Sequence, residues 1–232
     1  MRVAVIRFPG SNCEAETCRA VQTSGGEALA LSYRDRSLQG ADAVILPGGF
    51  SYGDYLRSGA IARFSPVMDA IRAHADSGGP VLGVCNGFQI LCEAGLLPGA
   101  LVRNALLRYL SRPVMVRVER TDTPFTTDFE EGETFQVPIG HGDGRYVATE
   151  EELERLEHNG QVVFRYTGTG VAGAPANPNG SAHDIAGLCN RDRNVVGMMP
   201  HPERIADPIQ GQAAGMRVFS SLVHAWAGRH GS

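Results

Sequence analysis

The sequence has 232 residues, of which 43% are hydrophobic and 20% are charged. This length supports one sizeable core and is short for two complete domains, so we expect residues 1–232 to form a single domain. The formal net charge of −4 provides no positive field for nucleic acid, and no basic run suggests binding to a membrane surface. No stretch reaches the roughly 18 apolar residues that cross a bilayer, and the apolar start is too brief and too charged for a signal peptide. We therefore expect a cytoplasmic protein.

The cysteine and lysine content excludes several kinds of chemistry. The five cysteines form an odd set without a CxxC pair or a Cys/His metal spacing, which argues against a disulfide framework and a structural zinc site. All 21 basic residues counted as Lys or Arg are arginine. Without lysine, the chain can form neither a pyridoxal Schiff base nor a Walker-type phosphate loop. We expect no metal and no cofactor in this chain, and if the reaction uses ATP, another chain should bind it.

The first half of the chain alternates short β-rich runs with longer amphipathic runs. Strands are predicted over residues 2–8, 27–33, 41–47 and 80–85, and helices over 13–26, 64–79 and 86–95. Alternating units of this size are typical of a parallel sheet with helices on both faces. We therefore predict an α/β fold with a single open, mostly parallel, twisted sheet flanked by helices.

The second half has a different pattern. Residues 101–139 combine β-rich runs with a turn-rich segment, which predicts a small antiparallel ribbon beside the main sheet. A surface helix with an acidic first turn is predicted over 148–160. A strand over 161–168, a Gly/Pro/Asn-rich loop over 171–184, a strand over 194–199 and a helix over 211–228 complete the prediction.

Four predicted strands end in turns of distinctive composition, which read PGSN, PGGF, CNG and PHPE in chain order. In open α/β sheets, ligands bind at the carboxyl ends of parallel strands, because loops and helix N-termini converge there. We therefore expect the four turns to share one rim that holds the functional site.

The segment Gly83-Val84-Cys85-Asn86-Gly87 has the form of the nucleophile elbow G-x-S-x-G, with sulfur in place of oxygen. A thiolate at this position would be stabilised by the helix N-terminus. The backbone N–H of Asn86, with a second donor from the turn at 48–49, could stabilise an oxyanion on an attacked carbonyl. The alternative is that Cys85 is only a small residue in a tight turn.

His201 is the histidine placed to act as a base, because it directly follows a rim strand in the segment PHPER. In an extended His-x-Glu segment the side chains at i and i+2 point to the same side. Glu203 could then bond one imidazole nitrogen and leave the other to take the proton from Cys85, as in a catalytic triad. The alternative is a proline-rigid turn with an ordinary His and Glu.

With Cys85 in GVCNGFQ and the HPE segment from His201 to Glu203, the chain resembles class I glutamine amidotransferase domains. The resemblance implies a flavodoxin-like sheet and a cysteine that attacks the side-chain amide of L-glutamine. A glutamyl thioester would form with release of ammonia, and water would then hydrolyse the thioester to glutamate.

The chain also resembles, over nearly its whole length, the glutaminase subunit of phosphoribosylformylglycinamidine synthase. The matching segments include PGGFSYGDYLRSGAIARF, VLGVCNGFQIL, GLLPGAL, NPNGS, DIAG and VVGMMPHPER. This resemblance implies a separate large synthetase subunit that uses ATP and Mg²⁺ to convert formylglycinamide ribonucleotide to the amidine in purine biosynthesis. A small bridging subunit is also implied as a partner.

The same resemblance assigns roles to individual residues. It makes Cys85 the nucleophile, His201 the general base and Glu203 its orienting partner, with oxyanion donors at Gly49 and Asn86. It also implies substrate contacts from Phe50, Gln89 and His141. Phe88 stands where other branches of the class often carry histidine, a departure that does not touch the triad.

Two of these assignments have plain alternatives. His141, in PIGHGDG, could be an exposed turn histidine rather than a substrate contact. The segment SYGDYLRSG at 51–59 could be a docking surface, or it could be only a packed loop between a strand and a helix.

Two other functions remain compatible with the motifs. A cysteine hydrolase of the same architecture could act on another amide or peptide, although Gln89 and the long purine-type segment do not suggest it. A non-catalytic flavodoxin-like module could bind a small anion or regulate a partner. Labelling of Cys85 by a glutamine-like diazo ketone separates the expected glutaminase from the first, and release of ammonia from glutamine separates it from the second.

Overall fold

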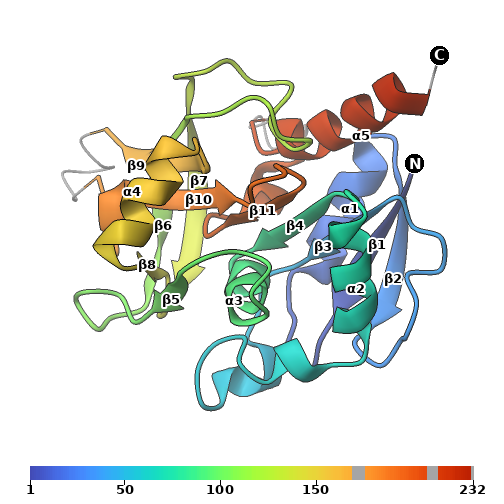
Figure 1. Cartoon of the computed structure of the whole chain (residues 1–232), viewed down its shortest axis with the longest axis horizontal. Coiled ribbons are helices and arrows are strands. Elements are labelled where there is room, and N and C mark those ends of the chain that lie inside the picture. Colours follow the sequence, from blue (N-terminus) through green and yellow to red (C-terminus); the bar gives the residue numbers. More distant parts are fainter. Residues whose placement is uncertain (169–175, 208–213, 231–232) are drawn as a thin grey trace.

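The computed structural model describes residues 1–168, 176–207 and 214–230 (Figure 1). Its main feature is a nine-stranded sheet with the strand order β2-β1-β3-β4-β11-β10-β9-β6-β7. The predicted loop at 171–184 and the predicted helix at 211–228 lie partly outside the described residues. No helix within the described ranges is both long and apolar enough to cross a membrane.

One half of the sheet is parallel, as predicted. It consists of β2 (Glu27–Ser32), β1 (Arg2–Arg7), β3 (Ala43–Leu46), β4 (Val81–Val84) and β11 (Val195–Met198). Every residue of β3, β4 and β11 is buried. Strands covered by helices on both faces have continuous apolar sequences rather than alternating ones, which explains AVIL, VLGV and VVGM.

The other half of the sheet is antiparallel. It consists of β10 (Ile185–Cys189), β9 (Val162–Thr167), β6 (Leu110–Val118) and β7 (Thr134–His141). The ribbon expected at 101–139 is therefore largely the β6–β7 pair, and it extends the main sheet instead of lying beside it. A separate two-stranded antiparallel sheet joins β5 (Ala100–Val102) to β8 (Arg145–Val147). The short strand β10 was not predicted, because IAGLC directly follows a turn-rich segment.

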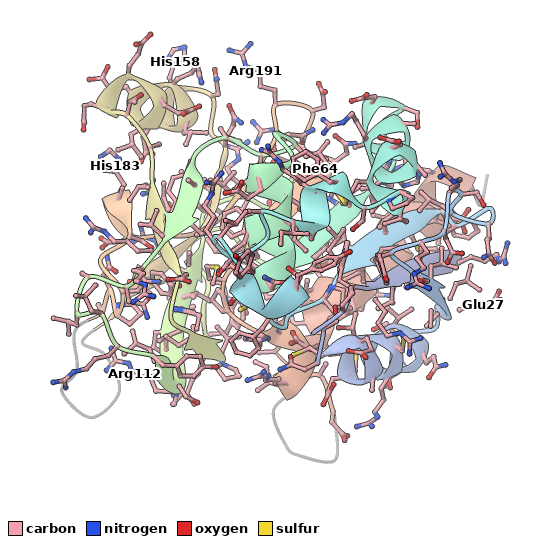
Figure 2. All side chains as sticks on the ribbon, turned by 90° about the horizontal axis from the view of Figure 1, so that it is seen from below. Glu27, Phe64, Arg112, His158, His183 and Arg191 are labelled. Atoms are coloured by element: carbon pink, nitrogen blue, oxygen red, sulfur yellow. The ribbon has the colours of Figure 1, made fainter. Side chains whose placement is uncertain are left out.

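Helices cover both faces of the sheet. Figure 2 shows α2 (Val67–Asp76) and α3 (Asn86–Glu93) on one face and α1 (Glu14–Thr23) on the other. The last helix, α5 (Met216–His230), packs against α1. The remaining helix, α4 (Glu150–His158), begins at Thr149, whose side chain accepts a hydrogen bond from the Glu152 N–H at 3.3 Å. This cap and the three glutamates of the first turn account for the predicted helix start.

The four distinctive turns meet at one end of the parallel strands. Strands β1, β3, β4 and β11 are neighbours in that order, so their carboxyl ends lie side by side. The turns after β1 and β3 are hydrogen-bonded to each other, from Asn12 N to Gly48 O at 3.2 Å and from Phe50 N to Gly10 O at 2.8 Å. The sheet topology therefore gathers the predicted functional residues at a single rim.

Candidate active site

Cys85 lies at a sharp bend between β4 and α3. Its backbone has φ 50° and ψ −106°, a region in which a residue with a side chain is strained by roughly 1–3 kcal/mol. Gly83 and Gly87 make the bend possible. A Cβ added at Gly87 would lie 1.9 Å from the carbonyl oxygen of Leu46, and a Cβ at Gly83 would lie 2.7 Å from the Gly87 backbone. The two glycines thus allow strand and helix to approach closely, as the elbow pattern predicted.

The Cys85 thiol is enclosed by the rim. Its side chain is 4% exposed, and the sulfur lies 3.8 Å from the Gly140 carbonyl oxygen at the end of β7. The residue also caps the N-terminus of α3. The unpaired N–H groups and the helix dipole favour negative charge at such a position.

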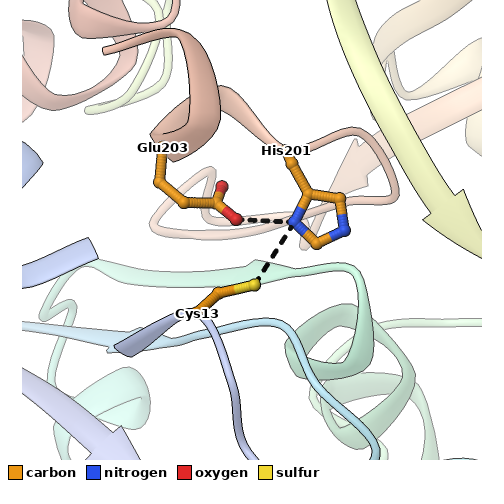
Figure 3. Close-up of side chains that lie close together, drawn as sticks. All are labelled: Cys13, His201 and Glu203. Atoms are coloured by element: carbon orange, nitrogen blue, oxygen red, sulfur yellow. Dashed lines mark hydrogen bonds and ion pairs between the residues drawn. The ribbon is translucent and has the colours of Figure 1, made fainter. Parts of the chain in front are cut away.

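His201 and Glu203 form a buried pair directly after β11 (Figure 3). The Nδ1 atom of His201 lies 2.5 Å from Oε1 of Glu203, and both side chains are at most 1% exposed. Burial disfavours the charged imidazole, but the negative charges of Glu203 and Cys85 outweigh it and raise the pKa of His201 well above its usual range. The other nitrogen, Nε2, is buried without a hydrogen-bond partner among the described residues, so it is the atom left to exchange a proton.

A second thiol, which the sequence did not single out, lies against the same imidazole. The sulfur of Cys13 is 3.9 Å from His201 Nδ1 (Figure 3), donates to Asn12 Oδ1 at 3.1 Å and accepts from Arg204 Nη2 at 3.4 Å. Cys13 follows β1, and its link to residue 201 depends on strand order, so nothing in its local sequence could reveal the contact.

Cys13, His201 and Glu203 also form a group of potential metal ligands, because their ligand atoms lie within 4.8 Å of one another. A metal would need a free lone pair on Nδ1, but the short bond to Glu203 is satisfied by a proton on that nitrogen. The guanidinium of Arg204 further opposes a cation next to Cys13. We therefore interpret the cluster as a hydrogen-bond network that fixes the orientation of the imidazole.

The predicted oxyanion donors lie on the turn after β3 and at the start of α3. The Phe50 N–H is bonded to Gly10 O, so the neighbouring Gly49 N–H is the better candidate donor. The Asn86 N–H belongs to the first turn of α3, where N–H groups lack acceptors within the helix. The Asn86 side chain accepts a bond from Ser51 N at 3.1 Å, which ties the turn to the helix.

Cys85 opens into a recess with a volume of about 10 Å³, room for about one water molecule. The recess contains all three predicted substrate contacts. Its lining residues are Gly49, Phe50, Asp54, Ser58, Cys85, Gln89, Gly140, His141, Gly142 and Asp143. The Gln89 side chain donates to the Asp143 carbonyl at 2.6 Å and accepts from Asn86 Nδ2 at 2.9 Å, so the protein's own groups occupy both ends of this amide.

His141 is 2% exposed, so the alternative of an exposed turn histidine is wrong. Its Nδ1 lies 3.1 Å from Asn104 Oδ1. Burial, with a smaller effect of the charge on His201, lowers the pKa of His141 to about 4, which keeps the imidazole neutral near pH 7. Its Nε2 is a buried atom without a hydrogen-bond partner in the described part of the chain.

Three polar residues of the recess were not singled out from the sequence, namely Asp54, Ser58 and Asp143. Asp54 and Ser58 lie in the long segment 51–59, and Asp143 lies two residues after His141 in HGDG. The position of Asp143 close to His141 in the sequence could have indicated that it lies in the site. No comparable sequence signal placed Asp54 there. Together with Cys85, His201 and Glu203 they place a thiol, an imidazole–carboxylate pair and a polar recess at one rim, which is the arrangement expected of a cysteine-dependent amidotransferase.

Comparisons with known proteins agree with this class. A family model described as a CobB/CobQ-like glutamine amidotransferase domain matches residues 1–226. The phosphoribosylformylglycinamidine synthase subunit PurQ of Rubrobacter xylanophilus is 55% identical over 96% of this chain and 98% of its own length. The PurQ subunit of Koribacter versatilis is 52% identical over 99% and 100% of the two chains. The structure of PurLQS from Thermotoga maritima contains a chain 40% identical, with a TM-score of 0.85, covering 97% of this chain and 98% of that one.

The fold, the site and the matched domain define a glutamine amidotransferase, and the chain is therefore an enzyme with glutaminase chemistry. Within that class, the chain belongs to the family of PurQ subunits of phosphoribosylformylglycinamidine synthase. The predicted open sheet with an antiparallel part is confirmed. The individual catalytic roles of Cys85, His201 and Glu203 stay predictions.

Proposed function

We propose that this chain hydrolyses L-glutamine with Cys85, His201 and Glu203 and delivers the ammonia to a separate synthetase subunit. The observation that carries the proposal is the Cys85 thiol at a strained elbow on the rim that also holds the buried His201–Glu203 pair. Glutamine hydrolysis requires an activated nucleophile, a base and oxyanion donors in one place, and these residues supply them.

The reaction proceeds in two balanced halves. His201 takes the proton of Cys85, the sulfur attacks the side-chain carbonyl carbon of glutamine, and the N–H groups of Gly49 and Asn86 stabilise the oxyanion. His201 then returns the proton to the leaving nitrogen, and ammonia departs as the C–N bond breaks. In the second half, His201 activates a water molecule that hydrolyses the glutamyl thioester, which gives glutamate and the free thiol. Glu203 holds Nδ1 throughout, so that Nε2 handles the proton.

The similarity to PurQ subunits supports a synthetase as the partner. In the proposed complex, the synthetase binds ATP and Mg²⁺ and uses the ammonia to convert formylglycinamide ribonucleotide to formylglycinamidine ribonucleotide in the cytoplasm. The absence of lysine from this chain supports the assignment of ATP to the partner. A small bridging subunit completes the assembly, in keeping with the PurLQS structure that the chain resembles.

Exposed apolar side chains support a docking face for the synthetase around the recess. The large hydrophobic residues that are exposed within the described ranges all lie in two segments, 50–64 and 106–109. They are Phe50, Tyr55, Leu56, Phe64, Leu106, Leu107 and Tyr109. The rings of Phe50 and Tyr109 lie 6.4 Å apart and join the two segments. We call these seven residues the apolar face. A surface of this kind marks a protein–protein contact, and here it would bring the source of ammonia to the synthetase.

The size of the recess supports weak activity of the free chain. Glutamine is larger than a space of about 10 Å³, so its binding requires the lining groups, several of which lie in segment 50–59, to move apart. Because Phe50, Tyr55 and Leu56 of the apolar face lie in segment 50–59, docking of the synthetase can favour the open arrangement. We therefore expect glutaminase activity to rise when the synthetase binds with its own ligands.

The decisive experiment compares wild type and Cys85→Ser in glutamine-dependent amination with the purified synthetase. We expect the variant to lose glutamine-dependent product while added ammonia restores full synthesis, because only glutamine cleavage is lost. Cys18→Ser, a half-buried cysteine on α1, is the matched control and should retain activity. Full glutamine-dependent activity of Cys85→Ser would overturn the proposed nucleophile.

Covalent labelling provides an independent test of the substrate. A glutamine-like diazo ketone should label the complex once, and peptide mapping should place the adduct on Cys85. An adduct elsewhere, or none, would contradict a glutaminase centred on this residue.

A further inference from the structure

The recess beside Cys85 is charged in a way that the cleavage chemistry does not require. Its lining contains two carboxylates, Asp54 and Asp143, and no arginine. The remaining titratable neighbour, His141, is neutral near pH 7 because burial lowers its pKa to about 4. The recess therefore favours a ligand with a positive group.

The two carboxylates share a neighbour. The Ser58 hydroxyl donates to Asp143 Oδ2 at 3.1 Å and also lies within hydrogen-bonding reach of Asp54. Asp54 Oδ1 is 3.5 Å from Asn86 Nδ2, and Asn86 directly follows Cys85. The pair thus lies next to the nucleophile and is bridged by a single hydroxyl that a cationic donor could replace.

A second observation points to a ligand in the same recess. His141 is 2% exposed, and its Nε2 is a buried atom with no hydrogen-bond partner among the described residues. Leaving a buried polar atom unpaired costs roughly 1–3 kcal/mol. A neutral imidazole nitrogen without a proton accepts a hydrogen bond, so it suits a ligand that carries N–H donors, such as a primary amide.

We propose that Asp54 and Asp143 bind the α-ammonium group of glutamine and thereby restrict the enzyme to the free amino acid. The inference rests on the proposed glutaminase function and identifies its specificity-determining residues. With the side-chain amide at Cys85, the other end of the substrate carries the positive group that two adjacent carboxylates require. Glutamine within a peptide, or an analogue without the amino group, would leave the two carboxylates facing each other without a cation between them.

The electrostatics of the free site fit this assignment. Burial, with a smaller contribution from the charge of Asp143, raises the pKa of Asp54 to about 6. A cation between the two carboxylates relieves both their repulsion and the cost of their desolvation. Arg103 lies 3.8 Å from Asp143 but is largely exposed, and no arginine of the described residues lines the recess beside Asp54. The substrate therefore provides a positive charge inside the recess.

The test measures kinetics of the full chain in complex with its synthetase. Wild type, Asp54→Asn and Asp143→Asn are assayed with glutamine and with glutaramate, which is glutamine without the α-amino group. Each variant should raise KM for glutamine by roughly 10- to 100-fold with little change in kcat, because one charged hydrogen bond is lost. Cleavage of glutaramate should be unaffected or improved, so discrimination against it should shrink. Asp69→Asn, an exposed aspartate on α2, is the control for the same chemical change.

The outcomes separate this inference from the proposed function. Thermal melts and titration calorimetry with the synthetase report whether each variant is folded and docked. Each variant should melt no lower than wild type and bind the synthetase with the same affinity. If wild type cleaves glutamine but both variants keep its KM and its discrimination against glutaramate within twofold, the ammonium site is wrong and the glutaminase stands. If wild type itself does not cleave glutamine in the complex, the proposed function fails first.

Discussion

His201 illustrates how individual residues of the site are set by their neighbours. Burial alone would keep the imidazole neutral, but Glu203 at 2.5 Å and the nearby Cys85 raise its pKa. Cys13 lies on the Nδ1 side of the ring, and Arg204 in turn donates to the Cys13 sulfur. The ring therefore has one nitrogen fixed by the protein and one left for the reaction, which is the requirement for a base that must also act as an acid.

Asp54 provides a pH prediction at the scale of one residue. Its folded pKa is about 6, above the ordinary 3.8, mainly because of burial and also because of Asp143, whose own neighbour is Arg103 at 3.8 Å. A carboxyl with a raised folded pKa binds its proton more tightly in the native state. Below about pH 4, Asp54 is protonated in both the folded and the unfolded chain and does not lower the stability. As pH rises towards about 6, ionisation of Asp54 progressively lowers the free energy of unfolding, and above that pH the loss is complete.

Asp54→Asn should consequently stabilise the free chain at pH 8 and leave it unchanged at pH 4. We expect a gain of roughly 1 kcal/mol at pH 8, after allowance for solvent screening of this half-exposed group. Thermal melts of wild type and variant over pH 4 to 8 measure it. If the difference in stability between variant and wild type were the same at every pH, ionisation of Asp54 would not be what destabilises the folded chain.

At the residue scale, the sequence could predict what local spacing encodes. GVCNG and HPE each placed a functional group on a strand end, and the structure brings these residues to the same rim. Cys13, Asp54 and Ser58 could not be found this way. Their roles in the rim depend on which strands are neighbours and on how segment 51–59 folds over α3, and neither is a property of their own neighbourhood in the sequence.

At the scale of elements, the close packing of α3 against β3 and β4 determines the geometry of the bend at Cys85. Gly87→Ala should be strongly destabilising, because the new Cβ would lie 1.9 Å from the carbonyl oxygen of Leu46, and Leu46 is held in β3 while Gly87 is held in α3. We expect a loss of about 3 kcal/mol or more in the free energy of unfolding, measured by chemical denaturation.

Gly228→Ala is the matched control for this substitution. Gly228 lies in α5, and a Cβ there meets no atom within 4 Å. Alanine at this position should be neutral or stabilising by roughly 0.5–1 kcal/mol, since it favours the helix. Similar stability of the two variants would mean that the elbow does not depend on close packing.

The elements also show where prediction from sequence ends. Buried parallel strands such as AVIL and VLGV are recognisable because they are short, apolar and bounded by turn residues. The sequence did not reveal strand β10 or the extension of the sheet through β9, β6 and β7, because antiparallel pairing between distant segments leaves no local signal. The predicted ribbon was therefore correct in kind but misplaced relative to the main sheet.

For the whole molecule, the position of the apolar face supports the proposed link between glutamine cleavage and the synthetase. Phe50, Asp54 and Ser58 of the first segment line the recess. Tyr109 of the second segment contacts Phe50, with the two ring centroids 6.4 Å apart. Leu56 and Leu107 are 80% and 74% exposed and have positive φ angles of 70° and 55°. Exposed leucines in this conformation contribute nothing to the core and carry backbone strain, which is consistent with a role outside the free chain.

Leu107→Asp should therefore weaken the complex without weakening the free chain. Aspartate tolerates a positive φ better than leucine, so the melting temperature of the free variant should not fall. Its affinity for the synthetase should drop roughly tenfold or more, because a charge replaces an apolar side chain in a desolvated contact. Thermal melts of the free chain test its stability. Titration calorimetry, with glutamine-dependent amination at limiting chain concentration, tests its binding to the synthetase.

Ala227→Asp, at an exposed position on α5, is the control and should bind the synthetase as wild type does. Unchanged affinity of Leu107→Asp would place the synthetase on another surface and remove the structural link between docking and the opening of the recess.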